Sequence, residues 1–514
     1  MKPETKYKGS LILAAIGDAL GWITEFEKST EALKSKYSTD YIADFHSWKK
    51  EVGGRFNGYV DYLEKGSYSD DTQLMLSVAR SINPDGFVDN EYFSKIELPN
   101  WLLYSRGAGR TIKTAARKIN RKSANWNNNF FSYKIGDSTI DYRECGANGA
   151  AMRILPIALA NFGDIEKIKE EIFGNSIITH GHPRAILGAM LYGFAIHTIL
   201  KFRPESFNYE SFLTELGKDI HNKLSVSFLK KPNFAAWEKE WNKKVSVLFL
   251  ERYNSTMDET QRYLRDTFKS LKHSDDDREV LEKLGCFKPE TKGSGLSTVI
   301  AGIYLCCKYS NEPIKAIEQA VNMIGTDTDS IAAFTGGLVG ALHGTAIIPD
   351  RLKNVQDYHY LIKTAIRLLE ISESRAKEVK LISNHSDKTL NKVVSDDYLI
   401  NEEVFFLPLG QGTIRNIDRQ DTLTKGKYNL IIDVDFKIGQ SCRFAKILNK
   451  PENTAKQVTY KNDFQGFKNF INSLNLSSPT QTKIELFMKG LNKAQTEEFE
   501  DILKSINIEK SYKQ

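Results

Sequence analysis

The sequence predicts a mainly α-helical protein that ends in a small α/β module. Over most of the first 380 residues, apolar residues recur at the three- and four-residue spacing of helices, as in Met75, Val78 and Ile82. Proline is sparse, at 13 of 514 residues, which suits helices better than loop-rich β architecture. After about residue 380 the pattern changes, and apolar residues such as Ile432 and Val434 alternate with charged ones, as in a half-buried strand.

We expect residues 1–380 to form one all-helical domain, in which the charged and aromatic stretch 204–290 is a helical insertion or a solvated outer layer. A polar stretch near Asn384 predicts a linker, and residues 390–514 are expected to be an α/β accessory module. Its helices are predicted from the apolar spacing at 464–474 and 499–506, and a further strand from the alternation at 484–488.

Composition excludes several classes of protein. The net charge of +6, from 71 basic and 65 acidic residues, is too balanced to indicate nucleic-acid binding. The five cysteines are an odd number without a C-x-x-C pair, so we expect reduced thiols and a cytoplasmic protein. We find no signal peptide and no apolar run that suggests a membrane segment.

Two acidic clusters stand at predicted helix starts. Ser69, Asp70 and Asp71 precede one amphipathic segment, and Asp327 and Asp329 precede another. Serine and aspartate are preferred N-caps, so capping alone would explain either cluster in isolation. Adjacent carboxylates repel unless a proton or cation lies between them, however, and Mg²⁺ is commonly bound through a few carboxylates. If the two helix starts face each other, they are able to share cations.

The second cluster does not match a calcium loop. Asp327-Thr-Asp329-Ser330 is followed by an apolar segment and lacks the loop glycine and the closing glutamate of an EF-hand. The histidine pair His180 and His182 precedes a proline at i, i+2 spacing without a third nitrogen or sulfur ligand nearby, which argues against zinc. We expect helix entry or a contact with a nucleotide instead.

Five ordered motifs between residues 8 and 350 resemble those of the ADP-ribosylglycohydrolase family. They are Gly17-Asp-Ala-Leu-Gly21 with Glu25 after it, Ser69-Asp-Asp-Thr72, Asn148-Gly-Ala-Ala-Met-Arg153, Thr179-His-Gly-His-Pro183 and Gly325-Thr-Asp-Thr-Asp-Ser330. Serine replaces the family's usual threonine at two positions, Ser69 and Ser330, and keeps the hydroxyl. Ala147 stands where the family often has glycine, which affects the fine shape of the ribose pocket.

The resemblance implies an all-helical fold with two Mg²⁺ ions, or Mn²⁺, in a cleft. The metal ligands that it implies are Ser69, Asp70, Asp71, Asp327, Asp329 and Ser330. Asp70, Asp71 and Asp327 would also take part in catalysis, with Glu25 as acid/base or substrate-positioning group, while Asn148, Gly149 and His182 would bind substrate. The reaction implied is hydrolysis of the glycosidic bond between ADP-ribose and an acceptor, such as a protein side chain.

Two alternatives stay open at this point. The same fold occurs in a lens crystallin, so a non-catalytic or ADP-ribose-binding protein is one of them, although both acidic clusters and Glu25 are intact. A hydrolase of a free ADP-ribosyl nucleotide is another. The C-terminal module would in either case serve as a surface for a protein partner or for oligomerisation. Asp18, within the first predicted helix, is expected to be structural, and Arg153 either pairs a phosphate or ties helices together.

Overall fold

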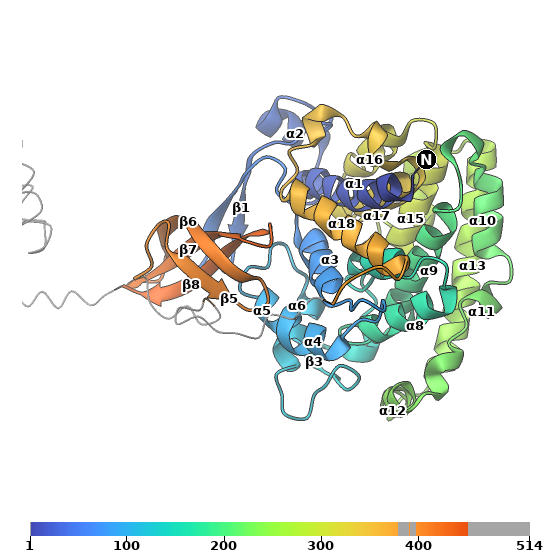
Figure 1. Cartoon of the computed structure of the whole chain (residues 1–514), viewed down its shortest axis with the longest axis horizontal. Helices are drawn as coiled ribbons and strands as arrows, with labels where there is room; N and C mark the ends of the chain where they lie inside the picture. Colours follow the sequence, from blue (N-terminus) through green and yellow to red (C-terminus); the bar gives the residue numbers. More distant parts are fainter. Residues whose placement is uncertain (1, 379–389, 391–396, 451–514) are drawn as a thin grey trace, which may run out of the picture. The chain divides into compact units, whose positions relative to one another are not determined.

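The structure, a computed structural model, describes residues 2–378, 390 and 397–450. Contacts divide the chain into a compact unit of residues 1–448 and a second unit of residues 449–514. The first unit combines a helical body with a four-stranded sheet (Figure 1). The helices predicted at 464–474 and 499–506 and the strand predicted at 484–488 lie outside the described residues.

The helical body confirms the mainly α-helical fold. Its helices are α1 (Pro3–Thr24), α2 (Thr30–Tyr37), α3 (Asp70–Arg80), α4 (Asn90–Tyr92), α5 (Leu98–Trp101), α6 (Arg110–Lys118), α7 (Leu155–Ala160), α8 (Ile165–Ser176), α9 (Pro183–Ile199), α10 (Tyr209–Gly217), α11 (Ile220–Lys223), α12 (Pro232–Trp241), α13 (Phe249–His273), α14 (Asp277–Lys283), α15 (Gly295–Lys308), α16 (Pro313–Val321), α17 (Thr328–His343) and α18 (Tyr358–Ser372). Short 3₁₀ and π turns join several of them.

Helices α1 and α17 run antiparallel in unusually close contact at the centre of this body. A Cβ atom added to Gly17 would lie 2.2 Å from the carbonyl oxygen of Ala332, and one added to Gly340 would lie 2.2 Å from that of Gly9. Only glycine permits backbones to approach so closely, which explains why the sequence accepts the cost of glycine within helices. The packing places the C-terminal end of α1 beside the N-terminal end of α17.

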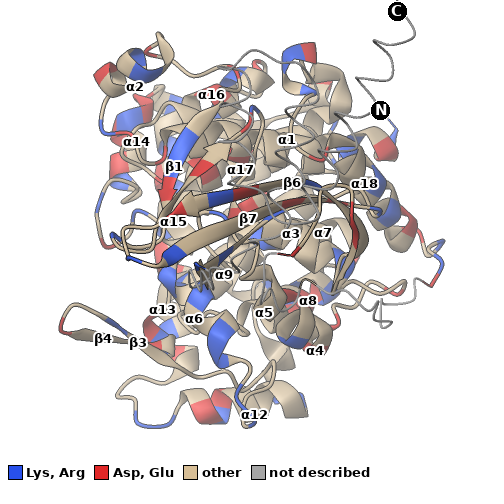
Figure 2. Ribbon diagram, turned by 90° about the vertical axis from the view of Figure 1, so that its left-hand side faces the viewer, with Lys and Arg blue, Asp and Glu red and all other residues tan. Residues whose placement is uncertain are grey.

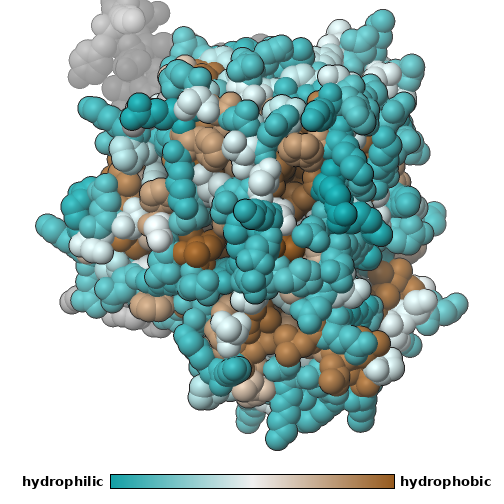
Figure 3. Space-filling model, turned by 90° about the vertical axis from the view of Figure 1, so that its right-hand side faces the viewer, coloured by the Kyte–Doolittle hydropathy of each residue, from teal (hydrophilic) through white to brown (hydrophobic). Residues whose placement is uncertain are grey.

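The segment 204–290 forms the helices α10 to α14 on the outside of the body. Its large aromatic side chains point inward, and Trp237, Trp241 and Phe249 are fully buried. Figure 3 shows the face on the side of α10 and α13, which is mostly hydrophilic with a few apolar patches. The insertion therefore covers the body and exposes its charged residues to solvent.

The prediction that residues 1–380 are all-helical is wrong for two hairpins. Strand β1 (Trp48–Val52) pairs with β2 (Tyr59–Leu63), and β3 (Ser132–Ile135) pairs with β4 (Ser138–Asp141), both antiparallel. Aromatic and β-branched residues favour the extended conformation in β1 and β2. The turn between β1 and β2 contains Gly53, whose φ of 91° lies in the region that favours glycine.

The C-terminal strands form a sheet, as predicted. β5 (Glu403–Phe406), β6 (Gly410–Asp421), β7 (Lys427–Phe436) and β8 (Ser441–Asn449) lie in the order β5-β6-β7-β8. Strand β7 is buried on both faces rather than half-buried, since Ile431 and Asp433 are covered as well as Ile432 and Val434.

The observed division of the chain lies at residue 448, later than the boundary expected between 380 and 390. The reason is that the sheet is joined to the hairpin β1–β2: Gln420 binds both backbone polar groups of Val60, and Arg443 binds Asp61. Figure 2 shows the molecule from the side on which β1, β6 and β7 lie.

One described segment, Thr328–Ile347, has the length and composition of a membrane span, which the sequence analysis did not anticipate. It comprises α17 and the turn that follows it, and 78% of its apolar window is buried inside the protein. A central helix of a folded body has this composition because it is covered on all sides. All five cysteines are buried and free.

Candidate active site

Three chain segments bring carboxylates to one cavity of about 240 Å³. Glu25 follows the last residue of α1, Asp70 and Asp71 begin α3, and Asp327 and Asp329 stand at the start of α17. All five carboxylate residues line the cavity, together with Ser330, Asn148 and Gly149. The two acidic clusters, about 250 residues apart in the sequence, therefore meet in the structure.

Helix α3 is held in place by Asp18 of α1. The buried Asp18 carboxylate accepts hydrogen bonds from the amides of Ser69 and Thr72 and from the Thr72 hydroxyl, at 2.6–3.2 Å. It thus satisfies N–H groups at the start of α3 that lack helical partners. The Ser69 hydroxyl accepts the amide of Asp71. Because capping is supplied by Asp18 and Ser69, the carboxylates of Asp70 and Asp71 remain available to the cavity.

Helix α17 is fixed against both α1 and α3. The Thr328 hydroxyl donates to the carbonyl oxygen of Gly21 at 2.8 Å, which ties the start of α17 to the end of α1. The Ser330 hydroxyl donates to the Asp71 carboxylate at 2.8 Å. These two bonds explain why the ends of three helices meet at one point.

Burial and mutual repulsion raise the pKa values of the clustered carboxyls. Burial first, and then the charge of Asp18, raises the pKa of Asp70 to about 7. Burial raises the pKa of Glu25 to about 8, with a further contribution from Asp327. Burial and neighbouring carboxylates hold the pKa values of Asp71 and Asp329 well above their ordinary range. A site that concentrates so much negative charge is stabilised by protons or by a cation.

Lys50, on β1, lies at the edge of this cluster and is a residue that the sequence analysis missed. Its positive charge acts on Glu25, Asp70 and Asp329. The Nζ atom is buried and makes no hydrogen bond, but it lies 3.9 Å from the ring centroid of Phe26 and 4.7 Å from that of Trp22. No sequence motif marks Lys50, because the hairpin brings it to the site.

Asn148 and Gly149, from a further segment of the chain, also line the cavity. The Asn148 amide group donates to Asp327 at 3.3 Å, and its backbone N–H donates to Gly293 at 2.8 Å. A Cβ atom at Gly149 would lie 2.9 Å from the His180 ring, so only glycine is accommodated there. Arg153, buried beneath them, donates to the carbonyl oxygen of Gly149 and ties it to α8.

The structure separates the two histidines. His182 is not among the residues that line the cavity; its Nδ1 accepts the amide of Arg184 and caps α9. His180 does line the cavity, with its Nδ1 bonded to the Thr179 hydroxyl at 2.7 Å. Burial lowers the pKa of His180 to about 3, so its imidazole is neutral. The expectation of a substrate contact thus shifts from His182 to His180, because the turn before Pro183 directs only His180 inward.

Other lining residues also lacked a clear signal in the sequence. They are Gly107, Gly109, Arg110, Thr111, Ile112, Tyr133 and Gly293. Gly107 and Gly293 approach the acidic side chains closely: a Cβ atom at either would lie 2.8 Å from a carboxylate oxygen, of Asp70 and Asp327 respectively. The Gly-x-Gly runs at 107–109 and 293–295 are the pattern that would have indicated these loops.

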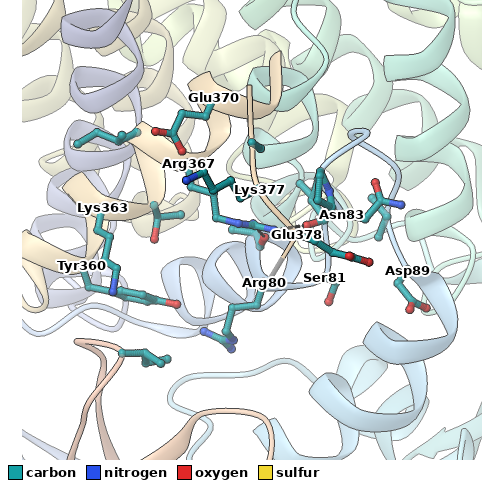
Figure 4. A pocket seen from close by; sticks show the side chains of 18 of the residues that line it. Arg80, Ser81, Asn83, Asp89, Tyr360, Lys363, Arg367, Glu370, Lys377 and Glu378 are labelled. Carbon is teal, nitrogen blue, oxygen red and sulfur yellow. Dashed lines mark hydrogen bonds between the residues drawn. The ribbon is translucent and has the colours of Figure 1, made fainter. Parts of the chain in front are cut away.

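A larger cavity, of about 1200 Å³, lies elsewhere, between α18, the end of α3 and residues 375–378. Figure 4 shows Tyr360 and Arg367 of α18 along this cavity with Arg80 and Asn83. Two of its arginines already have partners within the fold. Arg80 is paired with the buried Glu97, and Arg367 donates to the carbonyl oxygens of Ala79 and Ile82.

Comparisons with known proteins bear on the family to which the chain belongs. The family model described as ADP-ribosylglycohydrolase matches residues 1–378. ADP-ribosylhydrolase ARH3 of Xenopus tropicalis is 25% identical over 357 residues, which cover 67% of this chain and 89% of that protein. The ADP-ribosyl dinitrogen reductase glycohydrolase of Rhodospirillum rubrum is 29% identical over 195 residues, or 37% of this chain and 57% of that protein.

A further relative is the ADP-ribosylarginine hydrolase Tri1 of Serratia proteamaculans, 22% identical over 67% of this chain and 73% of that protein. A solved structure described as an ADP-ribosylglycohydrolase-related protein complex has a TM-score of 0.43 and 17% identity, and covers 72% of this chain and 100% of that one. Because the family model covers well over half of its length, the chain belongs to the ADP-ribosylglycohydrolase family of hydrolases.

Proposed function

We propose that the protein is a Mg²⁺-dependent hydrolase that cleaves the glycosidic bond between ADP-ribose and a protein side chain. The observation that carries this proposal is the meeting of five carboxylates from three helix ends at one cavity. Family membership supports the class of reaction, and the names of the relatives support the kind of substrate.

The side chains at the cavity suit a hard divalent cation. Carboxylate and hydroxyl oxygens are the donors that Mg²⁺ prefers, and Mn²⁺ accepts them as well. Among the described residues, no three or more His, Cys, Asp or Glu side chains stand in an arrangement that would itself hold a metal ion, so the proposal rests on donor chemistry and accumulated charge. The residues that would hold the ions are Asp70, Asp71, Asp327, Asp329 and Ser330, which line the cavity, and Ser69, which is buried and does not line it. Bound there, Mg²⁺ would orient the ribose hydroxyls and supply Lewis acidity.

Glu25 is the residue that we assign to proton transfer. With a pKa raised to about 8, its carboxyl group holds a proton at neutral pH and is able to deliver it to the leaving atom of the acceptor. A cation among the aspartates would remove part of the negative charge that raises this pKa. Burial, the largest cause, would persist, so the pKa would stay above that of an exposed glutamate.

Asn148, Gly149 and His180 are the residues that we assign to binding of the ADP-ribose moiety. Gly149 lets the backbone approach phosphate oxygens, and Asn148 offers an amide beside Asp327. The neutral His180 is suited to a hydrogen bond rather than to an ionic contact. These groups would bind and orient the ribose so that the scissile bond faces Glu25.

The test is the release of ADP-ribose from arginine-, serine- and nucleobase-linked substrates and from a free ADP-ribosyl nucleotide, each with Mg²⁺ and with EDTA. We expect EDTA-sensitive release from at least one protein-linked substrate. Release from the free nucleotide alone would contradict the proposed substrate, and equal rates with EDTA would contradict the metal. Binding of ADP-ribose without release from any substrate would show a non-catalytic member of the family.

A further inference from the structure

We propose that Lys50 is a positioning residue of the active site and that the C-terminal sheet holds it there through the hairpin β1–β2. This inference rests on the proposed function, in which Glu25 transfers a proton. It makes residues 403–448 part of the catalytic unit, although they lie beyond the matched family region at 1–378.

Lys50 contacts the residues on either side of Glu25. Its Nζ lies 3.9 Å from the ring centroid of Phe26, the residue after Glu25, and 4.7 Å from that of Trp22, one helical turn before it. A cation is attracted to both ring faces, so a single ammonium group restrains the segment that carries Glu25. The backbone N–H groups of Glu25 and Glu27 bond to the carbonyl oxygens of Gly21 and Thr24, and Lys50 adds a side-chain contact where the segment ends in the half-exposed Phe26.

The buried ammonium group of Lys50 has no hydrogen-bond partner, which is unfavourable unless nearby groups compensate for it. Here the compensation comes from the two aromatic rings and from the ionised carboxylates of the acidic cluster. The neighbouring Lys49 points to the other face of the strand, where it is exposed and lies 5.1 Å from the ring centroid of Tyr62. Of this adjacent pair, only Lys50 faces the acidic cluster.

The C-terminal sheet binds the hairpin at the residues of β2 that pair with Lys50 and its neighbour in β1. In the β1–β2 pairing, Lys50 faces Asp61 and Glu51 faces Val60. Asp61 accepts a hydrogen bond from Arg443 at 2.6 Å, and Gln420 accepts from the Val60 N–H at 2.9 Å and donates to its carbonyl oxygen at 3.0 Å.

The turn of the hairpin is held as well. The Asn429 side chain donates to the carbonyl oxygens of Asn57 and Gly58, at 3.1 Å each. A two-stranded hairpin alone is marginally stable in water. We therefore infer that the hydrogen bonds from the sheet stabilise the hairpin and so keep Lys50 at the site.

The first experiment compares Lys50→Met, Lys50→Arg and the matched control Lys49→Met in the full-length protein. We expect Lys50→Met to lower kcat by about 10- to 100-fold with KM nearly unchanged, because a misplaced catalytic group affects the chemical step. Lys50→Arg should recover most of the turnover, since arginine keeps the charge and stacks on aromatic rings. A raised KM with normal kcat, or the same result for Lys49→Met, would overturn the inference.

The second experiment does not depend on turnover. Hydrogen exchange of residues 22–28 should be faster in Lys50→Met than in the wild type or Lys49→Met, and exchange of residues 48–63 should be faster in Gln420→Ala. Lys437→Ala is the control within the sheet, because Lys437 contacts Glu403 and Gln411 and not the hairpin. Unchanged exchange in Lys50→Met would overturn the inference even if the protein is an active hydrolase.

A double-mutant cycle links the two experiments. If the sheet acts through Lys50, Gln420→Ala should lower kcat in the wild type but have little further effect on Lys50→Met. Equal losses in both backgrounds would show that the sheet acts elsewhere. Absence of hydrolysis in the wild type would instead contradict the proposed function, while the exchange data would still decide the role of Lys50.

Discussion

The acidic cavity and the cavity beside α18 contrast in size and in the state of their charges. The cavity beside α18 is about five times larger than the acidic one, at about 1200 against 240 Å³. In the larger cavity Arg80 and Glu97 neutralise each other within the fold. In the smaller one, Glu25, Asp70 and Asp71 carry raised pKa values because each is buried among like charges. Buried charge that the fold does not neutralise, and not volume, distinguishes the cavity that we propose to be catalytic.

The largest effect on turnover should come from a substitution in the acidic cavity. We expect Asp327→Ala to reduce ADP-ribose release to background while the fold stays intact or becomes slightly more heat-stable. Removing one carboxylate weakens cation binding and also relieves repulsion in the metal-free protein. Turnover and thermal unfolding would be measured beside Asp137→Ala, which alters an exposed carboxylate in the β3–β4 turn. Full turnover of Asp327→Ala would remove the basis of the metal assignment.

Glu25→Gln should lower kcat by about 10²- to 10⁴-fold and leave ADP-ribose affinity close to that of the wild type. The amide has nearly the same shape but cannot exchange a proton. Turnover and calorimetric binding would be compared with Glu31→Gln, a change in the exposed first turn of α2. Loss of ADP-ribose binding together with activity would make Glu25 a ligand-anchoring residue instead.

A change at the larger cavity should affect stability and not chemistry. Arg80→Met leaves the buried Glu97 carboxylate without its partner, which costs about 3–5 kcal/mol of unfolding free energy. The double variant Arg80→Met/Glu97→Leu should recover much of this loss. Chemical denaturation would measure both, and turnover per folded molecule should be unchanged. A fall in turnover per folded molecule would mean that the larger cavity contributes to catalysis.

The raised pKa values predict a pH-dependent stability in the metal-free protein. Since the folded state binds protons more tightly at Glu25 and Asp70, their contribution is complete below about pH 4.5 and is lost as the pH rises through about 7 to 8. Tm should therefore fall over this range. At pH 8, Mg²⁺ at 100 times its Kd should restore about 2.7 kcal/mol, and the same Mg²⁺ concentration is used at every pH. The restoration should be greater at pH 8 than at pH 5 and absent in Asp327→Ala; a shift independent of pH would contradict the assignment.

The smallest effect is expected from removing residues 449–514, which form a unit separate from the one that holds both cavities. Hydrolysis of a small ADP-ribosyl substrate should be unchanged. Release from a modified protein should slow if this part of the chain binds the target and raises its effective concentration. A loss of activity on the small substrate would show that the site needs this unit.

Much of the helical body and of the acidic site follows from local patterns. Patterns that span only a few residues predict these parts of the structure. They are the helical spacing of apolar residues, the acidic segments Ser69–Asp71 and Asp327–Ser330, and the glycines of α17. The hairpin β1–β2 escaped prediction because its strands are short and lie within a mainly helical region. His182 was chosen over His180 because spacing along the chain does not show which ring points inward.

The sequence by itself determined the chemical character of the site. Two helix starts carry more carboxylates than capping requires, and these groups together with Glu25 limit which chemistry the chain can perform. Only the tertiary structure decided how these groups meet. The antiparallel contact of α1 and α17 depends on glycines on both helices, and Asp18 holds α3 from 51 residues away. The hairpin that carries Lys50 is held by hydrogen bonds from Gln420 and Arg443, which lie more than 350 residues further along the chain. Such pairings arise from packing free energy over the whole fold, which no local run of residues encodes.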